Sequence, residues 1–112
     1  MREPERDSLR IQHMIDAANN VNEFMVGATL EEIKMNKMLF FAVVKNIEII
    51  GEAALMLTKE FKSANPHIPW RQIEGMRHVL VHEYFQISPL QVFKVFKEDL
   101  PLLLPQLLSL KS

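Results

Sequence analysis

The 112-residue chain contains no cysteine, which excludes disulfides, thiol nucleophiles and thiolate metal sites. That composition fits a reducing compartment, and we expect the protein in the cytoplasm. The first ten residues, MREPERDSLR, are highly charged and lack the apolar core of a signal peptide. No stretch approaches the roughly 18 apolar residues that a membrane span needs, so we expect no membrane partner.

Glycine is also scarce, and neither sign of charge is in large excess. Three glycines are too few for a turn-rich β architecture. Thirteen Lys and Arg stand against fourteen Asp and Glu, for a net charge of -1, so binding to RNA would require a local basic patch. A chain of this length can bury one core, and we predict that residues 1–112 form a single domain.

Apolar residues recur at three- and four-residue steps, the spacing of helices, along the whole chain. Residues 7–25 carry one such stripe, and Thr29 with Glu32 is a capping box for a short helix. Residues 36–62 read as one long helix that is apolar on more than one side, which is typical of a central helix or one shared with a partner. The pattern predicts an all-α, up-down bundle of four main helices plus a short extra helix.

The remaining helices are marked by proline. Pro69 fits the first turn of a helix that follows the loop ANPHIP, and Ser88 and Pro89 form a cap and first turn for the last helix. Pro101 and Pro105 each remove a helical hydrogen bond, so we expect them to kink or end that last helix.

The stretch RHVLVHEY, residues 77–84, gathers most of the titratable chemistry. Arg77 and His82 are five residues apart, about 140° around a regular helix, so the two side chains do not converge easily. Either the helix loosens near His82, or these residues meet counterparts from a second chain. A plainer alternative is a surface arginine, solvated histidines and a half-buried tyrosine. His78 and His82 could supply two metal ligands, but no third stands out, and we predict neither a metal nor another cofactor.

The spacing of Arg77, His82 and Tyr84, R-x4-H-x-Y, resembles the signature of the HepT-like branch of the HEPN superfamily. Residues 46–54, NIEIIGEAA, are similar to the central-helix motif of that family. Residues 68–85 follow its consensus around the signature, and KEDLP near the C-terminus resembles its last helix. The resemblance covers most of the chain.

Two positions depart from the family pattern. His78 stands where asparagine is frequent, and Glu83 stands where glycine is frequent. Neither change affects the arginine, histidine or tyrosine of the signature.

The resemblance implies a homodimer that associates through the face carrying this signature. It further implies a toxin that acts as a metal-independent endoribonuclease on tRNA or mRNA, paired with a minimal nucleotidyltransferase antitoxin. Arg77 and His82 would be the catalytic residues of a composite site. Tyr84 would be the residue that receives AMP from the antitoxin, which inhibits the toxin.

Two further residues have alternative interpretations. His78 either assists catalysis or is a solvated surface residue. Glu52 either orients Arg77 through a salt bridge or serves a structural role on the central helix.

Two other functions stay open at this stage. The small net charge favours a non-catalytic subunit that binds a nucleotide or other substrate for a two-component nucleotidyltransferase, since RNA affinity depends on neutralising phosphates. A plain dimeric bundle would use the polar cluster only for the specificity of its interface.

Overall fold

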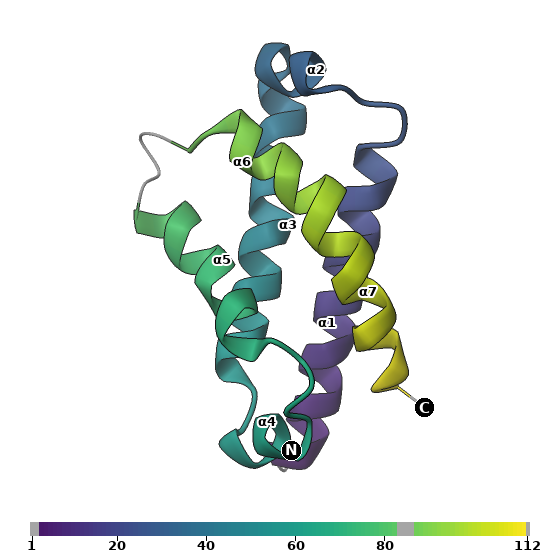
Figure 1. Ribbon diagram of the computed structural model, residues 1–112, viewed down its shortest axis with the longest axis vertical. Coiled ribbons are helices and arrows are strands. Elements are labelled where there is room, and N and C mark those ends of the chain that lie inside the picture. The colour runs from purple at the N-terminus through teal and green to yellow at the C-terminus, as the bar shows by residue number, and fades with distance from the viewer. Residues whose placement is uncertain (1–2, 83–86, 112) are drawn as a thin grey trace.

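The computed structural model describes the backbone of residues 3–82 and 87–111, and the side chains of residues 6–76 and 87–111. Throughout these ranges the ordered elements are helices, which confirms the all-α prediction. Their bounds are α1 Glu3–Phe24, α2 Leu30–Met35, α3 Lys37–Met56, α4 Lys59–Ala64, α5 Trp70–His82, α6 Pro89–Lys94, the π-helical segment η2 Val95–Asp99, and α7 Leu100–Ser109. They form an elongated bundle with extents of 43 × 27 × 25 Å. Figure 1 shows the arrangement of its helices.

The centre of the bundle is α3, which packs against α1 on one side and α5 on another. The predicted apolar stripe of the first helix is buried as expected: Ile11, Met14, Ile15, Ala18, Val21 and Met25. From α3, Val43, Ile47 and Ile50 join this core at zero exposure. Within the described residues, no helix combines the length and apolarity needed to cross a bilayer.

Side-chain caps start the short helices as the sequence predicts. The Thr29 hydroxyl accepts a hydrogen bond from the Glu32 amide at 3.2 Å and begins α2. Ser88 caps the Gln91 amide at 3.3 Å, with Pro89 as the first residue of α6. Each hydroxyl satisfies an amide that has no partner within its own helix.

The expectation of one long helix over residues 36–62 is wrong, because the chain leaves the helix at Leu57 and starts again after Thr58. The buried Asp7 carboxylate accepts hydrogen bonds from the Thr58 amide at 2.9 Å and from its hydroxyl at 2.6 Å. The Thr58 hydroxyl in turn caps the Phe61 amide at 3.2 Å. This contact with α1 gives Thr58 partners that a continuous helix would not offer, and it divides the segment into α3 and α4.

The last helix does not end at either proline but continues to Ser109. The distortion appears before Pro101, where η2 is wound as a π-helix and the Leu100 amide donates to the carbonyl of Val95. A proline ring clashes with the carbonyl four residues earlier in a regular helix. The wider π turn provides room for that ring, so the helical path survives.

The start of α5 is fixed by packing around Trp70, one residue after Pro69. The indole Nε1 donates to the carbonyl of Asn65 at 3.0 Å, and the ring meets Phe61 edge-on at 6.1 Å between centroids. Trp70 is buried. It therefore anchors the helix that carries the signature.

Candidate active site

Helix α5 carries three of the predicted site residues on its backbone: Arg77, His78 and His82. Their side chains are not among those described, and Tyr84 lies outside the described residues altogether. The backbone remains α-helical up to His82. The Cα atoms of Arg77 and His82 are therefore separated by about 140° around the axis. The backbone of α5 therefore does not unwind between Arg77 and His82, which was one of the two ways in which these residues could have met.

The central-helix motif places Asn46 at the junction of α1 and α3. Its side-chain oxygen accepts from Asn20 Nδ2 at 3.1 Å, and its Nδ2 donates to the Ala42 carbonyl at 2.8 Å. Asn46 is buried. Both ends of the amide are therefore hydrogen-bonded, and the bond from Asn20 links α1 to α3.

Glu52, the other polar residue of that motif, is exposed on α3. It borders a shallow surface hollow together with Arg10 and His13 of α1. Arg10 also donates to the carbonyl of Met56 at the end of α3. The predicted salt bridge from Glu52 to Arg77 involves a side chain that is not described and stays a prediction.

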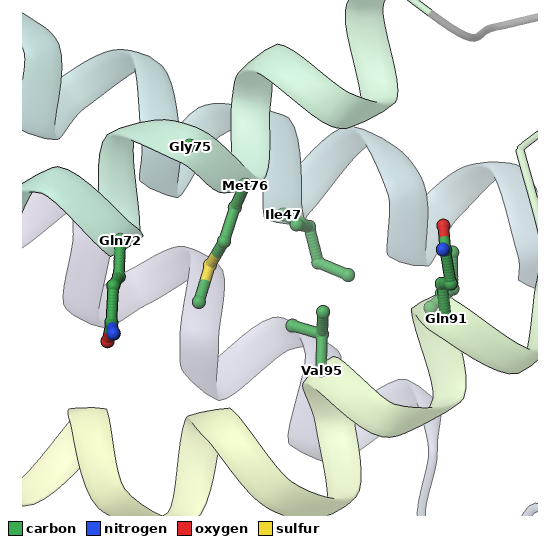
Figure 2. Close-up of a pocket in the computed structure, with 7 residues that line it drawn as sticks. Ile47, Gln72, Gly75, Met76, Gln91 and Val95 are labelled. Atoms are coloured by element: carbon green, nitrogen blue, oxygen red, sulfur yellow. The ribbon is translucent and has the colours of Figure 1, made fainter.

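A cavity of about 410 Å³ lies between α5 and the α6–η2 segment, and sequence reasoning missed it. Figure 2 shows Ile47, Met76 and Val95 projecting into it, with Gln72 and Gln91 at opposite ends. The lining is mostly apolar, and its floor is α3.

Gly75 forms part of the wall of this cavity. A Cβ at this position would meet nothing within 4 Å, so the absence of a side chain leaves space open. A glycine inside a helix lowers the stability of that helix by about 1 kcal/mol relative to alanine. The presence of such an unfavourable residue at position 75 was the one signal for the cavity in the sequence. His82 lies seven residues further along α5, roughly 10 Å along the axis, so the cavity and the signature share one helix.

Asp99 borders a second hollow, between α5 and α7, and its pKa is raised. Burial is the larger cause, and repulsion from Glu98 adds to it. A raised carboxyl pKa in the fold means that folding favours the protonated form. The stability of the fold relative to the unfolded chain is therefore highest, as far as Asp99 is concerned, at low pH where the carboxyl is protonated. It falls as the pH rises through the folded-state pKa of Asp99.

Asp99→Asn is therefore expected to raise the melting temperature at pH 7, with a smaller gain at pH 3. Thermal unfolding followed by circular dichroism at pH 3, 5 and 7 measures this. Glu98→Gln should give a gain in the same direction but smaller, because repulsion is the lesser cause. A gain for Asp99→Asn that does not depend on pH would contradict this account.

Among the described side chains, no three His, Asp or Glu residues cluster closely enough to hold a metal ion. The side chains of His78 and His82 lie outside that set.

A family model described as "Ribonuclease HepT-like" matches residues 14–110. A Methanocaldococcus jannaschii protein named "Putative RNase MJ1380" is 38% identical over 88 residues, which is 79% of this chain and 81% of that protein. The "Probable ribonuclease HepT" of Thermococcus cleftensis is 35% identical over 91 residues, 81% of this chain and 83% of that protein. No solved structure matches this chain.

The match covers all the motifs from the central helix to the last helix, in a bundle whose fifth helix carries Arg77 and His82. The chain belongs to the HepT-like ribonuclease family of the HEPN superfamily.

Proposed function

We propose that this protein is a metal-independent endoribonuclease and the toxin of a toxin–antitoxin pair, with Arg77 and His82 of two protomers forming a composite site. One observation carries the composite site: α5 is a regular helix up to His82. Residues five apart on such a helix face different directions, whereas two helices related by a dimer axis can present Arg77 of one chain beside His82 of the other. Family membership supports ribonuclease activity.

The proposed reaction is cleavage of RNA by its own ribose. The 2′-oxygen attacks the adjacent phosphorus, the bond to the 5′-oxygen of the next nucleotide breaks, and a 2′,3′-cyclic phosphate remains. His82 takes up or delivers the proton, because the reference pKa of histidine, about 6.5, lies near neutral pH. Arg77 stays charged and forms bidentate hydrogen bonds to the phosphate oxygens, on which negative charge develops in the transition state.

Tyr84 is the proposed target of AMP transfer from a minimal nucleotidyltransferase antitoxin. It lies two residues beyond His82 in the sequence. An AMP group there adds bulk and phosphate charge where the RNA phosphate must bind, so modification would block cleavage by occupying the site.

The test combines modification with cleavage. The protein purified alone is expected to cleave tRNA or single-stranded RNA in EDTA, and to lose this activity after treatment with the antitoxin and ATP. Intact mass should then show one added AMP per chain. Tyr84→Phe should gain no mass and keep cleaving after the same treatment. Inhibition of Tyr84→Phe to the same extent as wild type would overturn the role of Tyr84 but leave the nuclease proposal standing.

The net charge of -1 favours one alternative function, because RNA affinity depends on neutralising phosphates. In this alternative the protein is a binding subunit that presents a nucleotide or other substrate to a nucleotidyltransferase. In that case Arg77 would hold a phosphate and no cleavage would follow. Nucleotide binding that survives His82→Ala but is lost in Arg77→Ala, without cleavage by the wild type, would favour this rival.

A further inference from the structure

A hollow of about 300 Å³ lies where α2, the start of α3 and the start of α6 meet. The described residues that line it are lysines and large apolar residues: Ile33, Lys34, Lys37, Phe40, Phe41, Ile87 and Pro89. None of these lining residues is acidic, so the charges that they bring to the hollow are all positive. We call it the lysine–phenylalanine hollow.

One residue builds the corner that holds the two lysines. Asn36 ends α2, where its amide donates to the Glu32 carbonyl at 2.9 Å, and it begins α3, where its side-chain oxygen accepts from the Leu39 amide at 3.0 Å. Because this single residue separates the two helices, Lys34 in the last turn of α2 and Lys37 at the start of α3 lie on either side of a tight turn. Both therefore reach the same hollow.

The two lysines are available to an anion. Lys34 Nζ lies 3.5 Å from Glu31 Oε1, but the two side chains are 49% and 75% exposed, and an ion pair so open to water adds little to stability. Lys37 forms no ion pair with any residue that the structure describes. It is the first residue of α3, at the positive end of the helix dipole, where a cation is unfavourable and an anion is favoured. A bound phosphate would interact favourably with both lysines and with this helix end.

The aromatic part of the hollow is a pair of phenylalanines. The rings of Phe40 and Phe41 meet edge-on, 5.6 Å apart between centroids. Phe40 is half-buried and packs against the core, whereas Phe41 is 60% exposed. The core thus anchors one ring, and that ring supports the other at the surface. Exposed aromatic rings beside cations are the combination with which proteins bind single-stranded nucleic acid, because bases stack on the rings and the cations follow the phosphates.

The hollow also lies close to the proposed cleavage site. Ile87 lines the hollow and follows His82 by five residues, so their Cα atoms are at most about 18 Å apart. Figure 1 shows α5 running from α4 toward the end of the bundle where α2 and α6 lie. A strand whose phosphate is bound by Arg77 and His82 can therefore reach the hollow within a few nucleotides.

We propose that the lysine–phenylalanine hollow binds single-stranded RNA, with one base stacked on Phe41 and the adjacent phosphates in contact with Lys34 and Lys37. This inference rests on the proposed ribonuclease function and adds to it a substrate-binding site apart from the cleavage residues. It also gives a chain of net charge -1 the local basic patch that RNA binding requires. A base inside a duplex is already stacked on its neighbours, so the site selects single strands.

The test measures binding apart from cleavage. The probe is a short fluorescein-labelled 2′-O-methyl RNA, which cannot be cleaved by its own ribose because the 2′-oxygen is blocked. Its fluorescence anisotropy is followed as purified protein is added. Phe41→Ala is expected to weaken binding by roughly fivefold to 150-fold, the usual contribution of one stacked base. The same RNA annealed to its complement should bind more weakly and should not respond to Phe41→Ala.

The lysines are tested through the salt dependence of the same binding. Each phosphate contact on a single strand contributes about 0.7 to the slope of log affinity against log salt concentration. The double variant Lys34→Gln, Lys37→Gln should therefore make this slope shallower by about 1.4. A merely structural role for the lysines would weaken binding without changing the slope.

Matched controls remove the same chemical groups elsewhere. Lys59 is an exposed lysine that begins α4 at the other end of the bundle. Phe24, the last residue of α1, is 41% exposed and does not line the hollow. Lys59→Gln and Phe24→Ala should both bind the probe like wild type, and circular dichroism checks that every variant is folded.

A wild type that does not bind the probe would overturn this site, as would Phe41→Ala and lysine variants that bind it like wild type. A duplex bound as tightly as the single strand would overturn it too. Predicted binding responses without any cleavage of unmodified RNA would uphold the hollow and overturn the nuclease. Cleavage by wild type, with variants that bind normally, would do the reverse.

Discussion

His82→Ala is expected to lower the rate of RNA cleavage by about 10²- to 10⁴-fold, the usual contribution of a group that transfers protons in the transition state. Arg77→Ala should cause a loss of similar size, because its guanidinium would stabilise the charge that develops on the phosphate. Both variants are assayed with tRNA and single-stranded RNA in EDTA. The protein is purified without its antitoxin and its intact mass is checked for AMP.

Matched controls exist close to the site. His67 is an exposed histidine in the loop before α5, and Arg71 is an exposed arginine in its first turn. His67→Ala and Arg71→Ala remove the same chemical groups from the same region and should keep most of the activity. If all four variants lost activity equally, the effect would be one of general RNA affinity and the assignment of the site would fail.

The same assay can distinguish a site shared between two chains from a site formed within one chain. His82→Ala and Arg77→Ala chains mixed together can form a heterodimer in which one of the two sites has both residues intact. Partial recovery of cleavage on mixing is expected, since neither variant alone holds a complete site. No recovery despite heterodimer formation would mean that Arg77 and His82 of the same chain act together.

Asp7→Ala is expected to lower the free energy of unfolding by about 3 kcal/mol. Hydrogen bonds to a charged group contribute about 1.5–3 kcal/mol each, and the buried Asp7 carboxylate accepts two, from the amide and the hydroxyl of Thr58. Without the carboxylate, the Thr58 amide loses its partner, and the turn between α3 and α4 is no longer tied to α1. Urea unfolding followed by circular dichroism measures the change.

The control is Asp16→Ala, on the same helix. Asp16 is exposed and accepts a side-chain hydrogen bond from Gln12 at 2.9 Å, and its loss should cost well below 1 kcal/mol. In a Thr58→Val background, Asp7→Ala should cost less than in wild type, because the hydroxyl contact is already absent. Equal costs in both backgrounds would mean that the hydroxyl contact adds nothing to stability.

The local elements of the fold follow from the sequence because their determinants are near neighbours in the chain. Thr29 and Ser88 each cap a helix by accepting a hydrogen bond from the amide three residues later in the chain. The burial of the apolar stripe from Ile11 to Met25 is predicted from the helical period alone. The signature residues Arg77 and His82, with Tyr84, were likewise evident from their spacing and their resemblance to a family.

What the sequence alone left undecided depends on contacts between distant residues. The break at Thr58 is set by Asp7, 51 residues earlier, and no pattern within residues 36–62 contains that information. The cavity beside Gly75 exists because α5 and α6 pack on the same helix without filling the space between them. The face of α3 that carries Met38, Phe41 and Leu55 shows the same dependence. The sequence establishes that this helix is apolar on more than one side, but only the packing of α1 and α5 decides which side stays exposed, because burial is a property of the assembled helices and not of any one of them.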